Sequence, residues 1–179
     1  MIKKEQLRNI FWKRKVVKIL SENNRFRQSI NLENARDIGI YGIYESPEQL
    51  GSIIKFAQKL YQQNKTVKVL IYFPTLQDTV KTSLPIRQLP PTQISFSKFP
   101  SKKSLKAWHF IYEDFDILFD TSLGFHYVDV SVMSSSTAKF KVGKAGEWNS
   151  RVNDFSISFK DGISQGEALQ TMLDYLKIF

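Results

Sequence analysis

The distribution of apolar and polar positions along the chain predicts an alternation of strands and helices. Residues 115–122, Phe-Asp-Ile-Leu-Phe-Asp-Thr-Ser, are too continuously apolar for a strand with one solvent-facing side. Such a run is typical of a central strand that is buried on both faces of an α/β sheet. Residues 137–143 predict its partner strand. The apolar residues between the two segments predict a helical crossover: Val128, Val130, Val132 and Met133.

A second unit of the same kind lies earlier in the chain. Residues 37–44 and 66–73 carry the β-branched and aromatic residues that favour strands. Between them, residues 46–49 (Ser-Pro-Glu-Gln) combine a serine N-cap, a proline at the first helical position and a glutamine at the capping-box position. Apolar residues then follow at helical spacing: Leu50, Ile53, Ile54, Ala57, Leu60 and Tyr61. This βαβ order predicts two parallel strands.

The remaining segments give weaker patterns. Residues 154–159 alternate apolar residues with serine and predict a half-exposed strand. Ser164 and Glu167 form a second capping box, which opens a terminal helix with its apolar residues inward. Residues 75–91 are polar and interrupted by prolines, which predicts a flexible loop. Residues 94–97 predict a short strand toward a sheet edge, and residues 102–114 a short helix.

The N-terminal segment is a helix of a different character. From residue 3 to residue 22, apolar residues at helical spacing share a broad face while lysine and arginine fill the rest: Leu7, Ile10, Phe11, Val17 and Leu20. We expect this helix to pack on the body through Phe11 and Trp12, or to lie on another surface. The predicted organisation is therefore a basic amphipathic helix at residues 1–27 and a single α/β domain at residues 28–179.

Charge sharpens this division. The chain of 179 residues has a formal net charge of +9, and residues 1–27 hold nine of its 26 basic but only two of its 17 acidic side chains. The first segment thus carries +7, and the other 152 residues carry +2. Such asymmetry indicates either a polyanionic partner or membrane surface, or simply a solvated helix.

Composition excludes several classes of protein. The chain has no cysteine, so disulfides and thiolate metal sites are excluded. It has no apolar run long enough for a transmembrane helix, and the lysines and arginines at 13–18 interrupt any secretory signal. We expect a cytoplasmic protein, with peripheral membrane attachment left open. The fold class expected is a three-layer, Rossmann-like α/β domain with a mostly parallel sheet, preceded by the basic helix.

Ligands of open α/β sheets gather at the carboxyl ends of the strands. Two such ends carry polar residues, which we expect to form the mouth of a pocket: Glu45, Ser46, Asp120, Thr121 and Ser122. The helix beginning at Ser46 would favour an anion there, whereas the charge of Asp120 would repel one.

The sequence supports no catalytic residue, metal or cofactor. His126 and Asp129 are spaced to meet on a helix face, as a structural hydrogen bond or as an acid/base pair. His109 lies between two aromatic residues and is expected to pack against them. Metal-ligand spacing is absent. Gly39 and Gly42 lie within a strand and form no phosphate loop, and the Gly-x-Ser-x-Gly motif of many hydrolases is absent.

Four blocks of the sequence, taken in order, resemble an uncharacterised family of small bacterial proteins that is classified only as a domain of unknown function. They are residues 115–118, 137–143, 153–157 and 173–178. With the N-terminal helix, the similarity covers most of the chain. It supports the fold and implies no activity.

A fainter resemblance exists to the N-terminal domain of heptosyltransferase-like glycosyltransferases. It rests on the strand that begins with Phe115 and Asp116 and on the later block containing Ala138, Lys139, Lys141 and Gly143. Those enzymes use a second Rossmann-like domain to hold the nucleotide sugar, and this chain has no room for one.

Two functions remain in view. The first is a non-catalytic binding or adaptor module that docks on RNA or the ribosome, or on an anionic membrane surface. Its contacts would be the cations of the first helix: Lys3, Lys4, Arg8, Lys13, Arg14, Lys15 and Lys18. Membrane attachment would add Ile10, Phe11 and Trp12 at the interface. The second is a small-ligand-binding or glycosyltransferase-like enzyme with its site near Asp120.

Overall fold

The computed structural model describes residues 4–75, 86–93 and 105–178. Its centre is a sheet of six strands in the order β3-β2-β1-β4-β5-β6, and every neighbouring pair is parallel. The strands are β1 (Asp37–Ile43), β2 (Thr66–Tyr72), β3 (Ile86–Leu89), β4 (Ile117–Asp120), β5 (Phe140–Lys144) and β6 (Phe155–Ile157). The prediction of a Rossmann-like α/β fold with a parallel sheet is confirmed.

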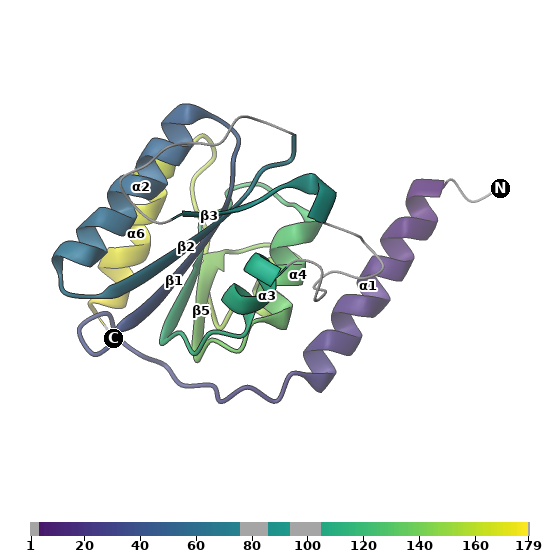
Figure 1. Ribbon diagram of the computed structural model, residues 1–179, viewed down its shortest axis with the longest axis horizontal. Coiled ribbons are helices and arrows are strands. Elements are labelled where there is room, and N and C mark those ends of the chain that lie inside the picture. The colour runs from purple at the N-terminus through teal and green to yellow at the C-terminus, as the bar shows by residue number, and fades with distance from the viewer. Residues whose placement is uncertain (1–3, 76–85, 94–104, 179) are drawn as a thin grey trace.

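Helices cover both faces of the sheet (Figure 1). One face carries α2 (Pro47–Gln62) and α6 (Gln165–Leu176). The other carries α3 (Leu105–Ile111), α4 (Tyr127–Ser135) and the single turn α5 (Asn149–Val152). Outside α4 lies α1 (Lys4–Glu22), at the edge of the molecule. A 3₁₀ turn, η1 (Pro91–Gln93), follows β3.

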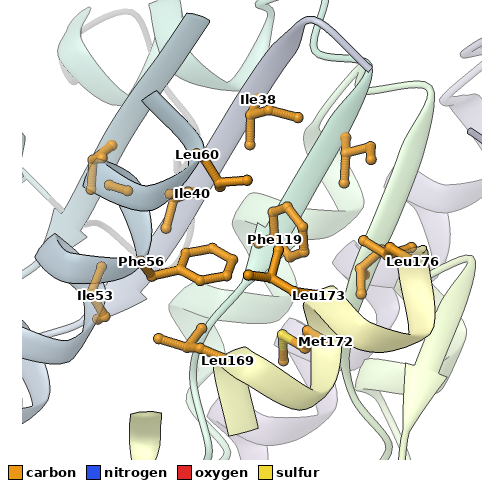
Figure 2. Packing of buried hydrophobic residues seen from close by; sticks show 14 of the residues in the cluster. Ile38, Ile40, Ile53, Phe56, Leu60, Phe119, Leu169, Met172, Leu173 and Leu176 are labelled. Carbon is orange, nitrogen blue, oxygen red and sulfur yellow. The ribbon is translucent and has the colours of Figure 1, made fainter. Parts of the chain in front are cut away.

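The two faces of the sheet bury separate apolar clusters because side chains alternate along each strand. Figure 2 shows the cluster beneath α2 and α6. There the rings of Phe56 and Phe119 meet edge to face, with centroids 5.1 Å apart. All five residues predicted to face inward from the terminal helix are buried: Ala168, Leu169, Met172, Leu173 and Leu176.

Both predicted helix starts are present. The Ser46 hydroxyl accepts the amide of Gln49, and Ser164 and Glu167 form a reciprocal capping box. The prediction for the inward face of α2 is wrong at Tyr61, which is exposed. Leu60 directly before it is fully buried, and Tyr61 lies about 100° further around the helix, which turns its side chain toward solvent.

The prediction of a flexible loop over residues 75–91 is wrong at its end, where Ile86–Leu89 form β3. This strand pairs in parallel with β2 at the sheet edge, and only its last residue is fully buried. An edge strand with polar residues gives little hydrophobic signal, and the flanking prolines hid it. The strand predicted at residues 94–97 lies outside the described residues.

The first helix packs on the domain, which was one of the two alternatives, and it does so through Trp12 as expected but not through Phe11. Trp12 is 4% exposed and donates its indole N–H to Ser131 of α4, while Val16 is also buried. Phe11 and Val17, expected to face inward, are 66% and 50% exposed. The helix carries apolar residues on two sides, and the aromatic contacts of Trp12 with Tyr127 and Trp148 select the side that is buried.

The segment after α1 is tied down along the domain. The Asn23 amide donates to the carbonyls of Ser134 and Ser136. Arg25, 3% exposed in its side chain, donates to the carbonyls of the two residues that precede β5 and pairs with Asp154. One of the nine cations of the N-terminal segment is therefore a structural contact.

Candidate functional site

The strand ends of the predicted pocket do come together. In the order of the sheet, β1 and β4 are the adjacent central strands from which the chain proceeds in opposite directions, and Tyr41 lies opposite Asp120. This is the switch point at which open α/β sheets bind ligands. The backbone N–H and hydroxyl of Thr121 both donate to the carbonyl of Tyr41, each at 2.9 Å.

Burial divides the five predicted residues into two groups. Asp120, Thr121 and Ser122 are at most 1% exposed, whereas Glu45 is exposed and Ser46 is half-buried at the start of α2. Asp120, Thr121 and Ser122 thus lie below the protein surface at the carboxyl end of the sheet. Their role in ligand binding stays a prediction.

A second carboxyl group lies close to Asp120. Asp129 projects from α4, is completely buried, and accepts a hydrogen bond of 2.9 Å from the Tyr41 hydroxyl. Burial raises the pKa of Asp120 to about 6, against the opposing effect of the Ser122 amide and hydroxyl. Burial, and then the charge of Asp120, raise the pKa of Asp129 well above its ordinary value. These two carboxyls can therefore hold a proton near neutral pH.

Gly143 makes the packing around Asp120 possible. A Cβ at this position would lie 2.5 Å from Nδ2 of Asn153 and 3.0 Å from Cβ of Asp120, so only glycine lets both approach β5. The Asn153 side chain is buried, and neither of its polar atoms has a hydrogen-bond partner among the described residues. The buried polar cluster thus joins the ends of β4 and β5 to the start of β6.

The histidine hypotheses have different outcomes. His126 caps α4, since its Nδ1 accepts the amide of Val128 at 3.2 Å, and burial lowers its pKa. It meets Asp129 through its backbone carbonyl, which is the structural alternative and not an acid/base pair. The expectation that His109 packs among aromatic residues is wrong: it lies on the exposed side of α3.

Sequence patterns did not indicate the buried Lys141. This residue of β5 is 1% exposed, and its Nζ donates to the Met133 carbonyl at the end of α4. Burial lowers its pKa well below the ordinary value. An available signal was its position inside the strand predicted to partner the buried central strand at residues 115–122.

The cations of α1 have several environments. Arg14 and Lys18 are exposed, and Lys18 lies 3.7 Å from Glu22 in an exposed ion pair. Lys15 is partly buried, which lowers its pKa. The Nζ of Lys13 lies 5.5 Å from the centroid of the Trp148 ring. Lys4 and Arg8 belong to the helix, and Lys3 lies outside the described residues.

A cavity of about 450 Å³ opens at the carboxyl end of the sheet. Its walls come from three segments: Trp12 and Lys13 of α1, residues 123–125 and Tyr127 after β4, and residues 144–149 at the end of β5 and beyond it. No sequence pattern indicated it, because its walls are distant in the chain. We refer to it below as the α1 cavity.

The strand order and the parallel pairing place the chain among the Rossmann-like α/β proteins. Residues 8–179 match the model of a family of unknown function, DUF6913, and the chain belongs to that family. No curated protein and no solved structure matches the chain. The resemblance to heptosyltransferase-like enzymes therefore stays a prediction.

The described residues contain neither a membrane-spanning helix nor a metal cluster. None of the helices they form is both long and apolar enough to cross a membrane. No group of three or more of their histidine, cysteine, aspartate or glutamate side chains is placed to hold a metal ion.

Proposed function

We propose that this protein is a non-catalytic RNA-binding module that docks on RNA, free or in the ribosome, through the outer face of α1. The observation that carries the proposal is the way α1 lies on the domain. Trp12 and Val16 face α4, so Arg14 and Lys18 face outward on a segment that carries +7. A fixed array of cations binds a polyanion by releasing its condensed counterions.

The position of Trp12 favours RNA over an anionic membrane. A helix bound at the membrane interface uses aromatic side chains as anchors. Trp12 is instead buried against α4, which leaves Phe11 as the exposed aromatic residue in the described part of the helix. Docking by charge requires no change in this packing, whereas membrane insertion with Trp12 would require α1 to leave the domain.

The test measures binding of a single-stranded RNA oligonucleotide over a range of salt concentrations. The double variant Arg14→Gln/Lys18→Gln removes two outward cations of α1. The control, Lys55→Gln/Lys160→Gln, removes the same charge from two exposed positions elsewhere. We expect the α1 variant to bind more weakly and to flatten the dependence of log K on log salt by about 1.4, or ~0.7 for each lost phosphate contact.

Two outcomes would refute the proposal. One is an equal loss of affinity in both double variants, which would show a general charge effect. The other is salt-sensitive binding to vesicles of anionic phospholipid without binding to RNA, which would make the membrane the partner.

A second candidate function is a small-ligand or glycosyltransferase-like site at the ends of β1 and β4. The observation in its favour is the pair of buried carboxyls, Asp120 and Asp129, at the switch point of the sheet. A thermal-shift panel of nucleotides and sugar phosphates on the wild type and Asp120→Asn tests it. Stabilisation that survives the substitution would place the site elsewhere, and no stabilisation of the wild type would remove its support.

A further inference from the structure

The α1 cavity has the position and size of a small-molecule site. Its volume of about 450 Å³ falls within the range typical of ligand pockets, ~300–1,000 Å³. It lies where the loops that follow β4 and β5 meet, at the carboxyl end of the parallel sheet. This end of the sheet is where α/β folds place their ligands.

Aromatic side chains dominate its walls. Trp12 lies at the centre of the group, with ring centroids 4.8 Å from Tyr127, 5.1 Å from Trp148 and 5.7 Å from Phe125. Trp12 and Trp148 are buried, while Phe125 is 54% exposed. Planar ligands stack on such rings, and a half-exposed phenylalanine at the entrance adds a face that a ligand can cover.

The charges around these rings select the sign of the ligand. Lys13 and Lys144 line the cavity together with one carboxylate, the exposed Glu147. Lys144 donates to the Leu123 carbonyl, which uses one of its three donors, and Lys13 lies over the Trp148 ring. An aromatic cage for a cationic ligand would be opposed by two ammonium groups, so the cavity favours an anion.

One polar group in the wall has no partner. Trp148 is 7% exposed, and its indole N–H has no acceptor among the described residues. Buried indole N–H groups normally have a hydrogen-bond acceptor, and a buried donor without one destabilises the protein. A ligand with carbonyl or ring-nitrogen acceptors can satisfy it.

We propose that the α1 cavity binds a nucleotide, with the base in the cavity against the aromatic side chains that line it and the phosphate near Lys13 and Lys144. The nucleotide is either a free mononucleotide or an unpaired residue of an RNA strand. A base supplies the planar surface and the hydrogen-bond acceptors, and the phosphate supplies the negative charge. The free form is independent of the proposed function, and the RNA form rests on it.

Tryptophan fluorescence gives a direct test, because two of the three tryptophans line the cavity. The third, Trp108, is partly exposed on α3, and Trp108→Phe removes its signal. AMP and UMP are titrated into this protein, with ribose 5-phosphate and adenosine as partial ligands. We expect saturable quenching by the nucleotides, weaker binding of adenosine, and no saturable quenching by ribose 5-phosphate.

Matched variants then locate the site. Phe125→Ala removes a stacking surface at the entrance, and Phe26→Ala removes a phenylalanine of similar exposure outside the cavity. We expect AMP to bind about tenfold more weakly to the first and unchanged to the second. Lys13→Gln should weaken AMP but not adenosine, whereas Lys18→Gln, on the outer face of α1, should change neither.

The proposal is overturned if neither mononucleotide gives saturable quenching at millimolar concentration. It is also overturned if Phe125→Ala and Phe26→Ala bind AMP equally. The Arg14→Gln/Lys18→Gln protein separates this proposal from the RNA-docking proposal. If this variant no longer binds RNA but binds AMP as the wild type does, the result supports a free mononucleotide as the ligand of the cavity. If AMP displaces RNA from the wild type, the result supports an unpaired RNA residue as the ligand.

Discussion

Replacing Asp120 by asparagine should change the pH dependence of stability in a way that follows from its burial. Its carboxyl has a pKa of about 6 in the folded protein, against an ordinary value of 3.8. The folded state therefore holds a proton that the unfolded state releases at lower pH, and stability falls as the pH rises from about 4 to above 6. At ~1.4 kcal/mol per pH unit, the shift from 3.8 to about 6 corresponds to about 3 kcal/mol.

Asparagine cannot ionise, so the stability of Asp120→Asn should not fall in this way as the pH rises. The new amide side chain would retain an acceptor for the Ser122 amide, which bonds to Oδ1 of Asp120 at 3.0 Å. Its added N–H₂ group takes the place of Oδ2, which has no hydrogen-bond partner among the described residues, and a buried donor without an acceptor lowers stability by about 1–3 kcal/mol at every pH. The prediction therefore concerns how the free energy of unfolding changes with pH. Between pH 4 and pH 8, that of the variant should rise by about 3 kcal/mol relative to that of the wild type.

Urea unfolding at a series of pH values measures this difference. Asp161→Asn is the control, because it removes a carboxylate from an exposed position. A free-energy difference between Asp120→Asn and the wild type that stays constant from pH 4 to pH 8 would contradict the argument. It would mean that the carboxyl is hydrated in the folded protein and that the buried cluster does not hold a proton.

Two further pairs of variants test the packing. Gly39→Ala should lower the free energy of unfolding by about 1–3 kcal/mol, since its Cβ would lie 2.7 Å from the ring of Phe115. Gly51→Ala, whose Cβ would have nothing within 4 Å, should raise it by about 0.5–1 kcal/mol. Urea titrations measure both changes. Equal effects would contradict the close approach of β1 and β4. Arg25→Gln should lower the free energy of unfolding by about 2–3 kcal/mol and speed proteolysis between α1 and β1. Its control, Arg27→Gln at an exposed position, should change neither. Unchanged proteolysis of Arg25→Gln would show that other contacts hold this segment.

The sequence allowed the central part of the fold to be predicted because local and global signals agree there. The continuous apolar run at residues 115–122 and the capping residue Ser46 each identify an element without knowledge of its neighbours. Two βαβ units then bring β1, β2, β4 and β5 into parallel pairs by topology alone. The adjacency of Tyr41 and Asp120 also requires the two units to pair through β1 and β4, which the structure shows and these sequence signals did not determine.

The features that could not be predicted depend on packing between distant segments. The burial of Asp129 and Lys141 results from the way α4 lies on the sheet. The inward face of α1 depends on the fit of Trp12 among Tyr127 and Trp148, and helical spacing alone left two apolar sides to choose from. The α1 cavity is a product of the same fit.

The docking of α1 has a consequence for the order in which the protein is made. The hydrogen-bond partner of Trp12 is Ser131, 119 residues later in the chain, and its ring partner Trp148 follows later still. At ~5–20 residues per second of translation, the helix waits about 6–24 s before the first of these partners is synthesised. During that interval Trp12 and Val16 lack the contacts with α4 that bury them in the folded protein. Helix α1 is therefore synthesised well before α4, the helix on which it packs, and it can dock only after α4 has formed.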